Sequence, residues 1–157
     1  PTQEVEIRNY IGDYLEGRGR ADLAERFSLG KFSMNLQSLE RTYIDKVFAL
    51  CDYYIQGRSK RCSRHLYDIY KLTPLIRFDD GFASLIGEVR DHRARMPICP
   101  SAEATVDVPA VIMEFCDNAF YREDYQAVTS YFAADAVPYD EAIGQMRALA
   151  AGNLFIR

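Results

Sequence analysis

The sequence predicts a mainly α-helical protein: a helical bundle domain with a short β segment near the N-terminus. Two patterns carry this prediction. From Leu39 onward, apolar residues recur at the three- and four-residue spacing of one helix face. Before Leu39 the chain is less regular, and residues 27–36 alternate loosely between apolar and polar side chains, as a half-buried strand does. We therefore expect two parts, residues 1–37 and residues 38–157.

The first part should contain a short helix followed by two short strands. A helix over residues 6–15 would place four apolar side chains on one side, and the glycines of residues 17–20 would end it. A turn at Gly30-Lys31 would then join two strands. The side chains expected to point inward from these strands are Phe27, Leu29, Met34 and Leu36.

The second part should contain six helices. Ser38 is a favourable N-cap for the first helix, and Gly57 suits its C-terminus. Ser63 is expected to cap the second helix, and Pro74 to close or bend it. The remaining four helices should span residues 80–95, 109–121, 124–134 and 139–151.

Charge is distributed unevenly along the chain. The formal net charge is −4, so affinity for a nucleic acid has to come from a local basic patch. Five positive side chains against the single acid Asp68 provide such a patch between residues 58 and 71. They are Arg58, Lys60, Arg61, Arg64 and Lys71. This excess suits an anionic ligand, such as a triphosphate or an RNA backbone.

The four cysteines do not form a metal-binding or disulfide pattern. Cys51, Cys62, Cys99 and Cys116 include no CxxC pair and have no histidine at zinc-ligand spacing. We expect all four thiols to be reduced and the protein to be cytoplasmic. No apolar run approaches the roughly 20 residues that span a bilayer, so no membrane partner is expected.

Lys46 and Asp68 are the side chains best placed for chemistry. Lys46 follows Ile44 by two residues, about 200° around the helix axis, so it should point away from the apolar stripe. Asp68 has potential cations at helical spacing, namely Arg64, His65 and Lys71. Such neighbours favour the ionised carboxylate. It could orient a lysine or a substrate hydroxyl, or it could form an ordinary helix ion pair, and the residues leave both readings open.

The joint pattern resembles the third and fourth motifs of the AbiEii/AbiGii nucleotidyltransferase toxin family. The residues that carry this resemblance are Arg41-Thr42, Lys46, Ser63-Arg64-His65, Tyr67-Asp68, Tyr70 and Leu72. The resemblance covers most of the chain, and residues 41–72 are its specific part. Shorter similarities lie at residues 99–102 and 121–125.

The resemblance implies a function. Members of the family resemble DNA polymerase β-like enzymes and move a nucleotide from an NTP to an RNA acceptor, often tRNA. It implies Mg²⁺ as cofactor and a cognate antitoxin as partner. Lys46 would contact the triphosphate, Asp68 would support catalysis, and Arg41 and Arg64 would help to bind the nucleotide. Residues 1–37 would be the tail of the nucleotidyltransferase α/β region, and residues 38–157 its C-terminal helical domain.

The sequence departs from the family in the first two motifs. It contains neither a Gly-Ser turn nor an Asp-x-Asp pair, and the adjacent Asp79 and Asp80 would face opposite sides of a strand. We therefore expect a C-terminal fragment of a nucleotidyltransferase that does not itself catalyse transfer. Mg²⁺ and NTP are expected to bind the intact parent protein, and no metal is expected on the fragment.

Two other functions remain open. The chain could be a helical module that binds an antitoxin or an RNA without chemistry. Alternatively, Arg58 and His65 have the R-x6-H spacing of HEPN-type ribonucleases, in which an Arg and a His pair across a dimer. A histidine can act as acid or base near neutral pH, but this spacing is weak evidence in a segment rich in arginine.

Overall fold

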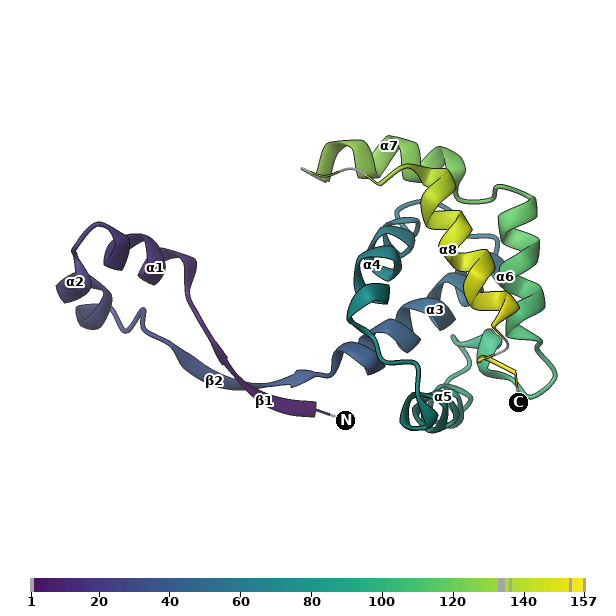
Figure 1. Cartoon of the computed structure of the whole chain (residues 1–157), viewed down its shortest axis with the longest axis horizontal. Helices are drawn as coiled ribbons and strands as arrows, with labels where there is room; N and C mark the ends of the chain where they lie inside the picture. Colours follow the sequence, from purple (N-terminus) through teal and green to yellow (C-terminus); the bar gives the residue numbers. More distant parts are fainter. Residues whose placement is uncertain (1, 133–134, 136, 153, 157) are drawn as a thin grey trace. The chain divides into compact units, whose positions relative to one another are not determined.

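The computed structural model describes residues 2–132, 135, 137–152 and 154–156, with only the backbone for residues 129–132. The chain divides into two compact units, Pro1–Ser38 and Leu39–Arg157. The prediction of a mainly helical protein with a short N-terminal β segment is confirmed. The described residues form eight α-helices and one two-stranded antiparallel sheet (Figure 1).

The first unit is a two-stranded β-ribbon whose strands are connected by two short helices. Strand β1 (Thr2–Ile7) pairs antiparallel with β2 (Phe32–Gln37), and the register sets Thr2 opposite Gln37. Helices α1 (Tyr10–Gly17) and α2 (Ala21–Arg26) lie between the strands in sequence. The turn expected at Gly30-Lys31 between two strands is wrong, because β2 pairs with β1 and not with residues 27–29.

The helix expected over residues 6–15 begins later than predicted. Residues 2–7 form β1, in which Val5 and Ile7 are the half-buried positions. Asn9 starts α1 because its side chain accepts a hydrogen bond of 2.9 Å from the Ile11 backbone N–H. The strand was missed because its partner lies far away in the sequence.

Gly12 packs closely against the backbone of Leu29. It is buried in α1, and a Cβ atom added there would lie 2.1 Å from the Leu29 carbonyl oxygen. The segment after α2 therefore passes directly over α1 at a position where only glycine fits.

The second unit contains the six predicted helices, with two short 3₁₀ turns. The α-helices are α3 (Leu39–Ile55), α4 (Arg64–Leu72), α5 (Asp80–Arg93), α6 (Val108–Asp117), α7 (Arg122–Phe132) and α8 (Tyr139–Ala151). The 3₁₀ turns are η1 (Thr73–Leu75) and η2 (Pro100–Ala102). Helix α8 has the predicted bounds, whereas α6 ends four residues before the predicted end. The predicted end of the fifth helix, Ala134, lies outside the described residues.

Helix α3 is the centre of the hydrophobic core. It packs against α4, α5 and α6, and α8 packs in turn against α4 and α6 (Figure 1). Six of its apolar or aromatic side chains are fully buried: Tyr43, Ile44, Val47, Phe48, Leu50 and Cys51. Phe155, near the other end of the unit, packs edge-to-face on Phe48 with ring centroids 5.7 Å apart.

A buried ion pair joins α3 to α5 and η2. Asp52 is only 3% exposed, and its Oδ2 accepts a hydrogen bond of 2.7 Å from Arg93. Its Oδ1 accepts from the backbone N–H of Ser101 at 2.8 Å and from the Ser101 hydroxyl at 2.6 Å. The same arginine donates to Asp45 at 2.9 Å, so one guanidinium bridges two acids two turns apart on α3.

All four cysteines are free and buried. Burial raises the pKa of each thiol, to about 12 for Cys116. They therefore behave as small hydrophobic side chains, as predicted for Cys51 and Cys116. Among the helices described, none is long and apolar enough to cross a lipid bilayer.

The contact at Gly12 generates a prediction. Gly12→Ala should destabilise the first unit by about 1–3 kcal/mol, because the new methyl group overlaps the Leu29 carbonyl. Gly17→Ala is the matched control in the same helix, since a Cβ there meets nothing within 4 Å. Amide hydrogen exchange would report the change as faster exchange in residues 10–29 for Gly12→Ala alone. Equal protection in the two variants would contradict the close contact.

Candidate functional site

Lys46 and Asp68 are in direct contact. Lys46 lies on α3 and Asp68 on α4. The Lys46 ammonium donates a hydrogen bond of 2.7 Å to Asp68 Oδ2. The Lys46 side chain is 23% exposed and that of Asp68 is 36% exposed. The pair therefore sits at the edge of the core, where both groups are partly shielded and still accessible to a ligand.

Lys46 keeps hydrogen-bonding capacity beyond this pair. A lysine ammonium carries three N–H donors. Asp68 is the one hydrogen-bond partner of Lys46 in the part of the chain that the structure describes. Two donors are thus available to an anionic group that approaches from the solvent side.

His65 is the third member of the site. Its Nδ1 lies 3.8 Å from Asp68 Oδ2, which is too long for a hydrogen bond but close enough for electrostatic attraction when the ring is protonated. The ring stacks on Tyr53 of α3, with centroids 5.9 Å apart and planes 13° from parallel. Arg58 lies over the same tyrosine ring, with its Cζ 5.2 Å from the centroid. Nothing in the sequence pattern indicated that Tyr53 contacts His65.

The environment keeps Asp68 ionised. Burial raises the pKa of this carboxyl, but His65 and the hydrogen-bonded Lys46 outweigh that effect and lower it below its ordinary value. The prediction of an ionised carboxylate among cations is therefore supported. Its predicted cation neighbours differ, because Lys71 binds Asp135 at 2.5 Å instead.

The two arginines assigned to nucleotide binding have different surroundings. Arg41 donates to Asp45 at 3.0 Å, one turn along α3, and Asp45 is also held by Arg93. Arg41 is thus part of the ion-pair network that leads to the core. Arg64 is exposed at the first position of α4, next to His65. Of the two, Arg64 is the more accessible to a ligand.

Asp124 of α7 anchors the basic loop that precedes α4. It accepts hydrogen bonds from the backbone N–H of Arg61 at 2.7 Å and of Ser63 at 3.1 Å. The Ser63 hydroxyl also donates to it, at 2.6 Å. The expectation that Ser63 caps α4 with its own side chain is therefore wrong, since its hydroxyl binds Asp124 and makes no capping bond. The sequence predicted a helix from residue 124 but gave no sign of this contact.

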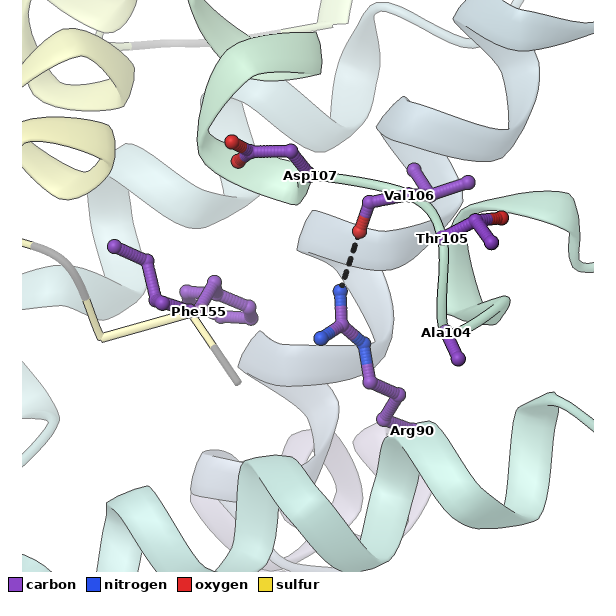
Figure 2. Close-up of a pocket in the computed structure, with 7 residues that line it drawn as sticks. Arg90, Ala104, Thr105, Val106, Asp107 and Phe155 are labelled. Atoms are coloured by element: carbon purple, nitrogen blue, oxygen red, sulfur yellow. Dashed lines mark hydrogen bonds between the residues drawn. The ribbon is translucent and has the colours of Figure 1, made fainter.

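The cavity drawn in Figure 2 is separate from Lys46 and Asp68. It has a volume of about 200 Å³ and is lined by Arg90, residues 104–107, Phe155 and Ile156. Arg90 extends from α5 toward the loop before α6 and donates to the Val106 carbonyl at 3.1 Å. None of the predicted site residues lines this cavity.

The described residues do not fit a magnesium site. Mg²⁺ takes an octahedral set of oxygen ligands, usually including carboxylates. Within the described ranges, no group of three or more His, Cys, Asp or Glu side chains could hold a metal ion. The accessible carboxylate of Asp68 already carries the Lys46 ammonium.

One comparison with known proteins finds a match. The model of a protein family described as "Nucleotidyl transferase AbiEii toxin, Type IV TA system" matches residues 1–146 of the chain. No curated protein and no solved structure matches the chain significantly.

The Lys46–Asp68 pair predicts a pH dependence of stability. The pKa of the Asp68 carboxyl is lower in the folded protein than in the unfolded chain, where it is about 4. Its ionised form therefore stabilises the fold above the unfolded-chain pKa, and this contribution is lost as the pH falls through the folded-state pKa. Asp68→Asn should therefore lower the free energy of unfolding at pH 7, by about 0.5–1 kcal/mol for a partly exposed pair.

The difference in the free energy of unfolding between Asp68→Asn and the unsubstituted protein should shrink when urea unfolding is repeated at about pH 3, below the carboxyl pKa of the unfolded chain. Asp117→Asn removes a more exposed ion pair, with Arg147, and serves as the control with the smaller effect. A difference that is the same at both pH values would show that the charge of Asp68 does not contribute.

Proposed function

The chain belongs to the AbiEii nucleotidyltransferase toxin family, and we propose that its Lys46–Asp68 site handles the triphosphate of an NTP during nucleotide transfer to RNA. The observation that carries this proposal is the 2.7 Å contact between the two residues. They are 22 positions apart in sequence, and the resemblance assigned both to one active site. We propose tRNA as the first acceptor to test.

Lys46 is suited to contact a triphosphate. Its ammonium is a compact charge, and Asp68 orients it while leaving two N–H donors available. Charge that develops on phosphate oxygens during transfer is stabilised by such a fixed cation. Asp68 has the supporting role, because it holds the lysine in place and is itself ionised.

The neighbouring basic loop supplies further positive charge. Arg64 is exposed and lies four positions before Asp68 in the sequence. Asp124 fixes the loop by accepting hydrogen bonds from the backbone of residues 61 and 63. We propose that Arg64 assists in binding the nucleotide. Arg41 contributes less directly, through the ion pair with Asp45.

Membership of a toxin family of type IV toxin–antitoxin systems implies an antitoxin as partner. We propose that a cognate antitoxin counteracts this protein. The expectation that the chain alone does not catalyse transfer stays a prediction. So does the expectation that Mg²⁺ and NTP act together in the intact parent protein.

Lys46→Ala tests the proposed function. In the full-length protein it should lower transfer of a labelled nucleotide from ATP, GTP, CTP or UTP to tRNA by about 100-fold or more, because the phosphate charge loses its fixed cation. The fold should persist, since the Lys46 side chain lies at the edge of the core.

Lys31→Ala is the matched control for this variant. Lys31 is also paired with one acid, Glu6, and lies outside the basic patch, so the control removes the same charge from a different ion pair. It should retain transfer within a few-fold. Transfer by Lys46→Ala at the unsubstituted rate would reject the proposed function, whichever NTP and RNA are used.

A further inference from the structure

The ring of His65 is held in one orientation. Its side chain is 15% exposed and stacks on Tyr53, whose ring also lies under the Arg58 guanidinium. Asp68 lies one helical turn away on α4. The charged and titratable groups around His65 are thus Lys46 and Tyr53 from α3, Asp68 from α4 and Arg58 from the loop between them.

The two nitrogens of the ring differ in their surroundings. Nδ1 is shielded from solvent, has no hydrogen-bond partner among the described residues and lies 3.8 Å from Asp68 Oδ2. Nε2 is not among the shielded atoms that lack a hydrogen-bond partner. A carboxylate beside Nδ1 favours the tautomer that carries its proton there, which leaves a lone pair on Nε2 that can accept a proton.

The same carboxylate oxygen faces both basic side chains. Asp68 Oδ2 accepts from the Lys46 ammonium at 2.7 Å and also faces His65 Nδ1. Asp68 therefore orients Lys46 through a hydrogen bond and His65 through electrostatic attraction across 3.8 Å.

We infer that His65 is the general base of nucleotide transfer and that Asp68 positions it, an inference that rests on the proposed function. Nε2 accepts the proton of the attacking RNA hydroxyl. The hydroxyl oxygen forms a bond to the α-phosphorus, and the bond from that phosphorus to the oxygen bridging to the β-phosphate breaks. Pyrophosphate leaves with that electron pair, and nothing is oxidised or reduced.

The pH dependence of transfer by the full-length protein tests the inference. His65→Gln keeps polar groups at the position but cannot take up a proton, so kcat should fall about 100-fold or more. The KM for NTP should stay within about threefold, and the loss of rate toward acid pH that marks a base should disappear. His92→Gln is the control, because His92 is the other histidine of the chain and lies exposed on α5.

A second measurement does not depend on activity. In the His92→Gln variant His65 is the one imidazole left, so its ring proton can be followed by NMR without ambiguity. Adding Asp68→Asn should move the ring nitrogen signals toward the tautomer with its proton on Nε2, because the carboxylate that favours Nδ1–H is gone. Unchanged signals would overturn the coupling, and this result decides the question if His65→Gln loses its helical circular dichroism.

The outcomes separate the two proposals. Full transfer by Lys46→Ala rejects the proposed function and with it this inference. Loss of transfer in Lys46→Ala, together with an unsubstituted rate and pH profile in His65→Gln, rejects only the general base. A fall in kcat for His65→Gln with the acid limb still present would also overturn it, because a structural role leaves the titrating group in place.

Discussion

The arrangement of the helical unit depends on one buried carboxylate, that of Asp52. A charge that is 3% exposed is tolerated only when it is paired and hydrogen-bonded, and Arg93 and Ser101 together satisfy both of its oxygens. Because Arg93 also binds Asp45 two turns earlier, α3 is fixed in rotation as well as in position. Lys46 follows Asp45 directly, about 100° around the axis, and this places it toward α4.

The helices could be predicted from sequence because their signals are local. The apolar stripe of α3 and the bounds of α8 follow from spacing within one segment. The β-ribbon could not be predicted in the same way. Its strands pair Thr2 with Gln37 across two intervening helices, and nothing in either short segment identifies the other as its partner.

The candidate site shows the same division. Lys46 and Asp68 were found through a family resemblance, and the structure places them together, whereas their catalytic roles stay predictions. Tyr53 and Asp124 were missed. In the sequence, nothing distinguishes Tyr53 from the other aromatic residues, and only the structure shows its ring stacked on His65. Asp124 has the position of an ordinary acidic residue in the first turn of a helix. Its real contact, with Ser63, spans 61 positions and has no local signal.

The reactivity of the buried thiols can report how often the core of the helical unit opens. Thiolate is the reactive form of cysteine, and burial of all four side chains both shields the sulfur atoms and disfavours that form. A maleimide or iodoacetamide label should therefore react with molecules whose core has opened and spare the closed ones. Rates of labelling across the second unit would measure how often its helices separate, and a cysteine introduced on the surface could be modified selectively.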